Sequence, residues 1–259
     1  MYKVDLNCDL GESFGSYRIG MDEVIIPYIS SANVACGFHA ADPVVMSKTV
    51  ASCKEHNVMI GAHPGLPDLV GFGRRNMDIT PLEAKTMVQY QIGAIMAFCK
   101  AQGVSLQHVK PHGALYNMAG KDYTLAKAIC EGVKEVDPEL IMLVLAGSQM
   151  ERAASDLELR VAKEVFADRA YEEDGSLVAR SKPGAMIEDE NVVIERVLKM
   201  ILEGKVTTLT GKEMPMQADS VCVHGDGEKA LMFVRRLAEA LEEHKIRICN
   251  LSEILYKVK

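Results

Sequence analysis

Four of the seven histidines stand at or just after the ends of short apolar runs: His39, His63, His112 and His224. An imidazole titrates near neutral pH, so it can take up or release a proton during a reaction. Carboxylates and cations occur at equivalent run ends: Asp9, Glu12, Asp168, Asp226, Arg74, Lys110 and Arg169. The other histidines fall at helix ends or inside a strand: His56, His244 and His108. We therefore expect one shared functional site built from the run-end residues.

Two kinds of chemistry fit this set of side chains. In the first, the histidines and carboxylates exchange protons, while the cations hold a carboxylate or phosphate and stabilise developing negative charge. In the second, Asp9, His63 and His112 bind a divalent metal through one oxygen and two nitrogens, with positions left open for water. The sequence alone does not decide between the two.

The apolar runs predict the elements that position these side chains. They are near-continuous, which suits strands of a parallel sheet covered on both faces, and they alternate with helix-period segments. The runs occupy residues 4–9, 32–37, 58–63, 106–110, 141–147, 162–168, 220–225 and 246–250. Together with the length of 259 residues, they predict one α/β domain, 1–259, folded as a (β/α) TIM-like barrel of seven to eight parallel strands. An open doubly wound sheet is the alternative, and a small hairpin insertion is expected around 206–218.

Local signals place two of the helices. Thr-Pro-Leu-Glu at 80–83 forms a capping box, and it predicts a helix that continues to about Gln102 and stops at Gly103. Asp42-Pro43 predicts another helix start, because the Asp side chain accepts from free backbone N–H groups and Pro has no N–H to lose. The buried face of the first helix is expected to contain these residues or their neighbours: Met87, Gln91, Ile95 and Phe98.

Composition and motifs disfavour several classes of protein. The 29 basic and 36 acidic side chains give a net charge of −7 without a basic run, so neither nucleic acid nor a membrane is expected as a partner. The seven cysteines are scattered without C-x-x-C spacing, which is typical of reduced core residues, and we expect a cytoplasmic protein. Phosphate-loop, dinucleotide-binding and G-x-S-x-G motifs are missing from the sequence.

Six ordered segments resemble the LamB/YcsF family, the family of 5-oxoprolinase A subunits. They are DLNCDLGESFG, SANVACGFHAADP, IGAHPGLPDLVGFGRR, HVKPHGALYN, FADRAYEEDGSLVARSKPGA and VCVHGDG. The resemblance runs from residue 5 to about residue 230 and so covers nearly the whole chain. It implies a barrel related to the glycoside hydrolase/deacetylase fold. It also implies opening of 5-oxoproline to L-glutamate coupled to cleavage of ATP (with Mg²⁺), and 5-oxoprolinase B and C subunits as partners.

The resemblance also suggests roles for individual residues. The substrate carboxylate and a phosphate would be held by cations, with acidic residues beside them: Arg74, Lys110, Arg169, Arg180, Lys182, Glu12 and Asp168. Water would be activated by Asp9 or by one of His39, His63 and His112, and His224 with Asp226 would protonate the ring nitrogen. By analogy with barrel deacetylases, Asp9, His63 and His112 would be the metal ligands. The alternatives are a metal-dependent carbohydrate deacetylase and a non-catalytic subunit that presents substrate.

Overall fold

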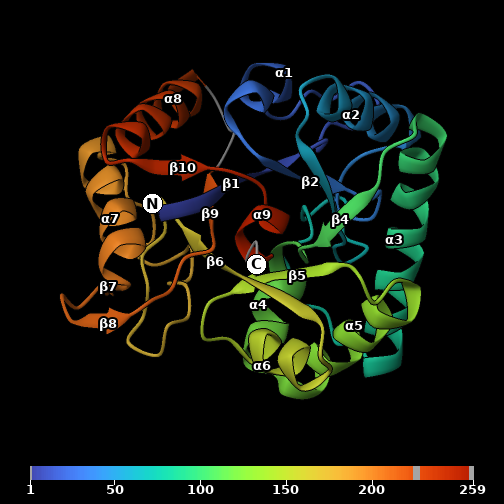
Figure 1. Ribbon diagram of the computed structural model, residues 1–259. Coiled ribbons are helices and arrows are strands. Elements are labelled where there is room, and N and C mark those ends of the chain that lie inside the picture. The colour runs from blue at the N-terminus through green and yellow to red at the C-terminus, as the bar shows by residue number, and fades with distance from the viewer. Residues whose placement is uncertain (1, 224–227, 257–259) are drawn as a thin grey trace.

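The computed structural model describes residues 2–223 and 228–256, and it shows a closed parallel barrel surrounded by helices (Figure 1). Seven strands form the wall in the order β1, β2, β3, β4, β5, β6, β9, and β1 pairs with β9 to close it. Their bounds are β1 Tyr2–Leu10, β2 Ser31–Ala35, β3 Met59–His63, β4 Leu106–Val109, β5 Ile141–Leu145, β6 Arg160–Phe166 and β9 Ser220–Val223. The predicted barrel is therefore confirmed, and closure rules out the open sheet.

An eighth parallel strand, β10 (Ile246–Ile248), pairs with the first residues of β1 outside the closed ring. The helices are α1 Asp22–Ile25, η1 Ile26–Tyr28, α2 Pro43–Glu55, α3 Pro81–Gln102, α4 Gly113–Lys121, α5 Tyr123–Val136, α6 Gln149–Asp156, α7 Glu190–Glu203, α8 Glu228–Glu243 and α9 Leu251–Leu255. A separate two-stranded antiparallel sheet pairs β7 (Lys205–Thr207) with β8 (Glu213–Pro215). In the described part of the chain, no helix combines the length and apolar character needed to cross a membrane.

The helix signals of the sequence act as expected. Thr80 and Glu83 form the capping box at the start of α3, and Gly103 ends that helix in the left-handed conformation. Asp42 accepts from two backbone N–H groups at the start of α2. The predicted buried face of α3 is correct for Gln91 and Ile95, whereas Met87 and Phe98 are only half-buried. Their neighbours fill the core instead: Ala84, Val88, Ile92 and Cys99.

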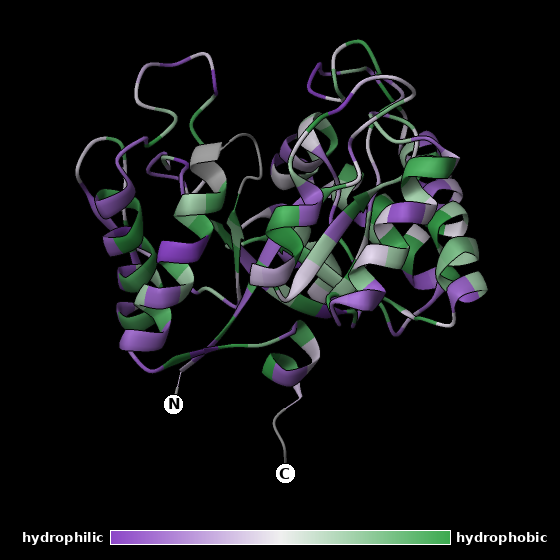
Figure 2. Cartoon of the chain, turned by 90° about the horizontal axis from the view of Figure 1, so that it is seen from above, coloured by the Kyte–Doolittle hydropathy of each residue, from purple (hydrophilic) through white to green (hydrophobic). Residues whose placement is uncertain are grey.

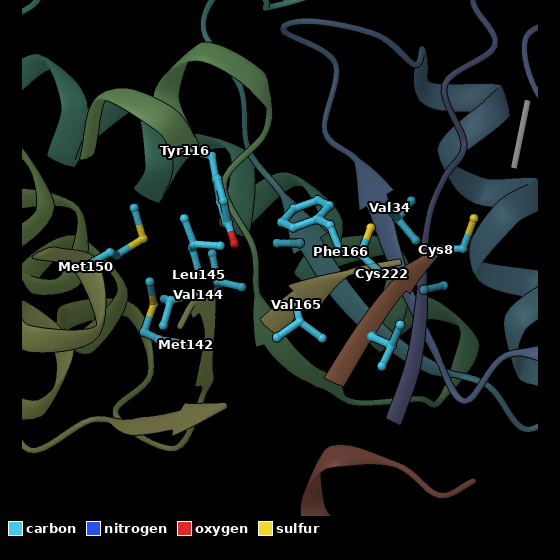
Figure 3. Packing of buried hydrophobic residues seen from close by; sticks show 14 of the residues in the cluster. Cys8, Val34, Tyr116, Met142, Val144, Leu145, Met150, Val165, Phe166 and Cys222 are labelled. Atoms are coloured by element: carbon cyan, nitrogen blue, oxygen red, sulfur yellow. The ribbon is translucent and has the colours of Figure 1, made fainter. Parts of the chain in front are cut away.

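The main apolar core lies between the strands and the surrounding helices. Met142 and Val144 of β5 belong to the same buried cluster as Met150 of α6, and Figure 3 shows their side chains on the same side of the strand. All seven cysteines are buried and unpaired, as expected for core residues. Alternate residues of the strands point the other way, and many of those inside the barrel are polar.

The two ends of the barrel differ. Leu251 of α9 packs on Ile141, Leu143 and Ala162, so α9 covers the end at which the strands begin. Figure 2 shows both termini at this end, whereas the long connecting loops gather at the opposite end. Those loops follow the carboxyl ends of the strands, where α/β barrels place their ligand sites.

Candidate active site

A cavity of about 820 Å³ opens at the carboxyl ends of the strands. Eight of the residues predicted from sequence line it: Asp9, Glu12, His63, Arg74, Lys110, His112, Arg169 and Arg180. They come from segments far apart in the chain, and the parallel strands bring them together because their carboxyl ends meet at one mouth. Asp9 is the second-last residue of β1 and His63 is the last residue of β3. His112 stands immediately before α4.

Asp9 is the carboxylate at the floor of the cavity. Its Oδ2 lies 3.3 Å from His63 Nε2, and its Oδ1 lies 3.0 Å from Lys110 Nζ. Asn33 donates to the same Oδ1 at 2.9 Å. Burial would raise the pKa of Asp9, but its contacts with His63 and the Lys110 ammonium outweigh that effect and hold the pKa well below its usual value. Asp9 is therefore ionised at neutral pH.

Lys110 lies beneath Asp9 with only 2% of its side chain exposed. Its Nζ is 2.7 Å from Glu164 Oε1 and 3.2 Å from Asn7 Oδ1. Burial favours the neutral amine, yet the carboxylates of Asp9 and Glu164 raise the pKa of Lys110 well above its usual value. The ammonium is thus already held by two carboxylates, so its contacts suit the positioning of Asp9 better than the binding of a substrate anion.

His63 and His112 are fixed by backbone carbonyls on their outer sides. His63 Nδ1 lies 2.7 Å from the carbonyl oxygen of Lys110, and His112 Nε2 lies 2.8 Å from that of Phe72. Their inner nitrogens, His63 Nε2 and His112 Nδ1, are 2.9 Å apart. Burial, and then the neighbouring imidazole of His63, lower the pKa of His112 to about 3, so His112 is neutral at physiological pH.

His39 lies behind this pair and is fully buried. Its ring stacks on that of His112, with centroids 3.7 Å apart and planes 3° from parallel. Its Nε2 is 3.4 Å from Glu12 Oε1. Burial and then the neighbouring histidines lower the pKa of His39 well below its usual value. His39 therefore belongs to the cluster, but it is not among the residues that line the cavity.

Three arginines line the cavity: Arg74 and Arg180 are exposed, and Arg169 is buried. Arg74 lies over the ring of Phe72, 4.9 Å from its centroid. Arg169 donates to the carbonyl oxygen of Val178 at 2.6 Å, and burial, with a further contribution from Arg180, lowers its pKa to about 10. Arg169 remains charged at neutral pH. The three arginines, called the arginine rim below, are therefore suited to an anionic ligand.

Comparison with known proteins identifies the family of the chain. Residues 4–256 match the LamB/YcsF family. A Clostridium beijerinckii protein, named as the A subunit of 5-oxoprolinase, is 68% identical over 254 residues, which cover 98% of this chain and 100% of that protein. The chain belongs to the LamB/YcsF family.

Other members extend the comparison. A Bacillus subtilis protein with the same name is 53% identical over 253 residues, which cover 98% of both chains. The crystal structure of a lactam utilization protein from Thermus thermophilus superposes with a TM-score of 0.90. That protein is 48% identical, and the match covers 95% of this chain and 99% of the other.

Four further residues predicted for the site are not among those that line the cavity in the described part of the chain. Lys182 is largely exposed and pairs with Glu172, its Nζ 2.8 Å from Oε1. Asp168 does not line the cavity. His224 and Asp226 lie outside the described residues, so their predicted roles stay predictions.

Sequence reasoning missed the polar layer beneath the site. Asn7 accepts from both Asn33 (2.7 Å) and Lys110 (3.2 Å), and Glu164 accepts from the Tyr116 hydroxyl at 2.7 Å. His108 was expected to be an ordinary strand residue. It does lie in β4, but its Nε2 is 2.7 Å from Asn33 Oδ1 inside the barrel.

One signal for this layer was present in the sequence. Asp5, Asn7 and Asp9 alternate with apolar residues along β1, so a single face of the strand carries only polar side chains. The apolar residues between them pack outward against the helices. Such an alternation in the first strand indicates a polar barrel interior.

Proposed function

We propose that this chain is the A component of an ATP-dependent 5-oxoprolinase, which opens the lactam of 5-oxoproline to L-glutamate with hydrolysis of ATP. The observation that carries the proposal is the full-length similarity to relatives named as 5-oxoprolinase A subunits, one of them 68% identical. The proposed complex also contains B and C subunits, uses ATP with Mg²⁺ and acts in the cytoplasm. The remaining support comes from the chemistry of the cavity.

Substrate binding is assigned to the arginine rim. The cavity of about 820 Å³ exceeds the size of a single five-membered lactam, so it has room for a phosphorylated form of the substrate as well. Arg74, Arg169 and Arg180 can bind the substrate carboxylate and a phosphoryl group through paired N–H donors. We assign Lys182 no direct contact, because it is exposed and paired with Glu172.

Water activation is assigned to the floor of the cavity. An amide carbonyl resists attack by water, and phosphorylation of its oxygen creates a leaving group. Asp9 and the inner nitrogens of His63 and His112 can orient a water molecule and accept its proton as the oxygen adds to the ring carbonyl carbon. The ring nitrogen must gain a proton when its bond to that carbon breaks, and His224 with Asp226 remains the predicted donor. This step leaves the phosphate on the new carboxyl group as an acyl phosphate, and a second water then releases phosphate to give glutamate.

Lys110 is assigned the role of positioning Asp9. Its ammonium lies between Asp9 and Glu164, so it holds the Asp9 carboxylate in one place and keeps it ionised. In this role it supports proton transfer without contacting the substrate.

The test is coupled turnover by the reconstituted complex. The chain is mixed with its candidate B and C subunits, 5-oxoproline and MgATP, and both glutamate and phosphate are measured. Replacing Lys110 or His112 by Ala should lower glutamate formation at least about a hundredfold, a typical acid–base contribution. His56→Ala is the matched control, because His56 is exposed at the end of α2.

Two results would count against the proposal. Near-normal coupled turnover by both folded variants would remove the assigned site. Release of acetate from an N-acetyl sugar without ATP would support the deacetylase alternative instead.

A further inference from the structure

The facing nitrogens of His63 and His112 require a positive charge beside them. A neutral imidazole carries one N–H and one lone pair. Carbonyl oxygens only accept, so the protons lie on the outer nitrogens, His63 Nδ1 at 2.7 Å and His112 Nε2 at 2.8 Å from their carbonyls. Both inner nitrogens then present lone pairs to one another across 2.9 Å. Only a shared proton or a cation relieves this repulsion.

One carboxylate lies beside each of the two facing nitrogens. Asp9 Oδ2 lies 3.3 Å from His63 Nε2, and Glu12 Oε1 lies 3.7 Å from His112 Nδ1. Ligands bound to one metal ion at about 2.0–2.2 Å stand roughly 3–3.5 Å apart, which is close to these separations. The imidazole planes of His63 and His112 are 86° apart, so their in-plane lone pairs can converge on one ion.

The outer contacts are those of metal-binding histidines. A ligating imidazole usually donates its second N–H to a carbonyl or carboxylate, which fixes the ring and its tautomer. His63 and His112 both do so.

His39 does not belong to the ligand set, although it lies within reach. An ion bound to an imidazole nitrogen lies in the plane of that ring. The planes of His39 and His112 are parallel within 3° and their centroids are 3.7 Å apart, so one ion cannot lie in both planes. His39 Nε2 instead faces Glu12 at 3.4 Å and can donate to it, which orients that carboxylate.

The charges of the buried cluster point to a divalent ion. Asp9, Glu12 and Glu164 contribute three negative charges, and Lys110 contributes one positive charge. Among these four side chains the carboxylates outnumber the ammonium, and a divalent cation would offset that excess. Two imidazoles with two carboxylates are typical ligands of Zn²⁺ and similar transition metals.

We propose that His63 Nε2, His112 Nδ1 and the carboxylates of Asp9 and Glu12 bind one divalent transition-metal ion of the Zn²⁺ class. This set adds Glu12 to the three ligands suggested by analogy and excludes His39. When bound, such an ion would polarise water at the floor of the cavity, and this would take the place of direct proton acceptance by the inner nitrogens of His63 and His112. The inference does not rest on the proposed function, because metal binding can be measured on the chain alone.

The test is direct metal binding by untagged protein that has been stripped with a chelator. Co²⁺ is titrated while its visible absorption is recorded, and Zn²⁺ is measured by calorimetry and by elemental analysis after dialysis. One equivalent should bind. His63→Ala and Glu12→Gln should each weaken Co²⁺ binding at least about tenfold, a magnitude seen even when only the partner behind a ligand is changed. His39→Gln keeps an N–H that can donate to Glu12, so it should lose less binding than either ligand variant. His56→Ala controls for binding by exposed histidines.

The outcomes that overturn the inference are distinct. Absence of stoichiometric Co²⁺ and Zn²⁺ binding by folded wild-type protein would do so. So would ¹⁵N spectra showing one proton shared by His63 and His112 in the presence of Zn²⁺. Equal loss of binding in His39→Gln would show that the ligand set is wrong. Circular dichroism of each variant separates lost ligands from lost folding.

Discussion

The effect of Glu164→Gln on the free energy of unfolding should change sign when Lys110 is also replaced. A double-mutant cycle on this buried contact measures the two effects. Glu164→Gln removes one of the two charges that hold the Lys110 ammonium. Gln keeps an oxygen that can accept from the Tyr116 hydroxyl, so the change is mainly one of charge. Lys110→Met removes the cation that contacts both the Asp9 and the Glu164 carboxylates.

The distances set the magnitudes. At 2.7 Å and an effective dielectric constant of about 20, Coulomb's law gives the Lys110–Glu164 pair roughly 6 kcal/mol of attraction. Removing a buried carboxylate also recovers several kcal/mol of desolvation, so Glu164→Gln should lower the free energy of unfolding by only about 1–3 kcal/mol. Lys110→Met should lower it by about 3–5 kcal/mol, because it strands buried charge. In the Lys110→Met background, Glu164→Gln should raise stability.

Urea unfolding of the four proteins, followed by circular dichroism at pH 7, measures this cycle. The comparison requires similar slopes of unfolding free energy against urea, since a changed slope signals a different unfolding reaction. An equal cost of Glu164→Gln in both backgrounds, within about 0.5 kcal/mol, would refute the coupling. Lys110 and Glu164 would then act independently, and the assigned positioning role of Lys110 would lose its basis.

Three further predictions concern stability. Burial raises the pKa of Asp5 from 3.8 to about 6, so the folded state holds this proton more tightly than the unfolded state does. The free energy of unfolding should therefore fall by about 3 kcal/mol as the pH rises from about 4 through 6. Asp5→Asn should remove that part of the pH dependence of the urea midpoint. A Cβ at Gly61 would overlap the His108 imidazole, so Gly61→Ala should cost roughly 3 kcal/mol in urea unfolding, and adding His108→Ala should recover part of the loss. Thr80→Ala removes the acceptor for the Glu83 N–H and should lower the free energy of unfolding by about 1 kcal/mol. The melting temperature should fall accordingly, and an unchanged melting temperature would show that the cap is dispensable.

The elements of this fold could be predicted because their signals are local. Apolar runs identified all seven wall strands, and the capping residues Thr80 and Asp42 identified helix starts. Asp9, His63 and His112 could be grouped because each lies at or just after the end of a strand, and parallel strands end at the same mouth. No knowledge of register was needed for this grouping.

Contacts within the barrel could not be predicted in the same way. Asn33 reaches both Asn7 and Asp9 because β2 pairs with β1 in one register, with Asn33 opposite Asp9. A shift by one residue would point Asn33 outward, and the sequence alone does not fix that register. The position of Lys182 could not be predicted for a related reason. It lies in an irregular segment between β6 and α7 whose path depends on tertiary packing, and it pairs with Glu172 instead of lining the cavity.

The polar interior of the barrel also explains how the Asp9 carboxylate stays ionised although it is largely buried. Leu251 of α9 packs at the end where the strands begin, and the cavity opens at the other end. The Asp9 carboxylate is therefore held from below by the side chains of Asn33 and Lys110 rather than by bulk water. Groups fixed before a ligand arrives need little reorganisation when charge develops, which is the main electrostatic advantage of a preorganised site. On this view the buried layer sets the charge state of Asp9, and the arginine rim selects the ligand that reaches it.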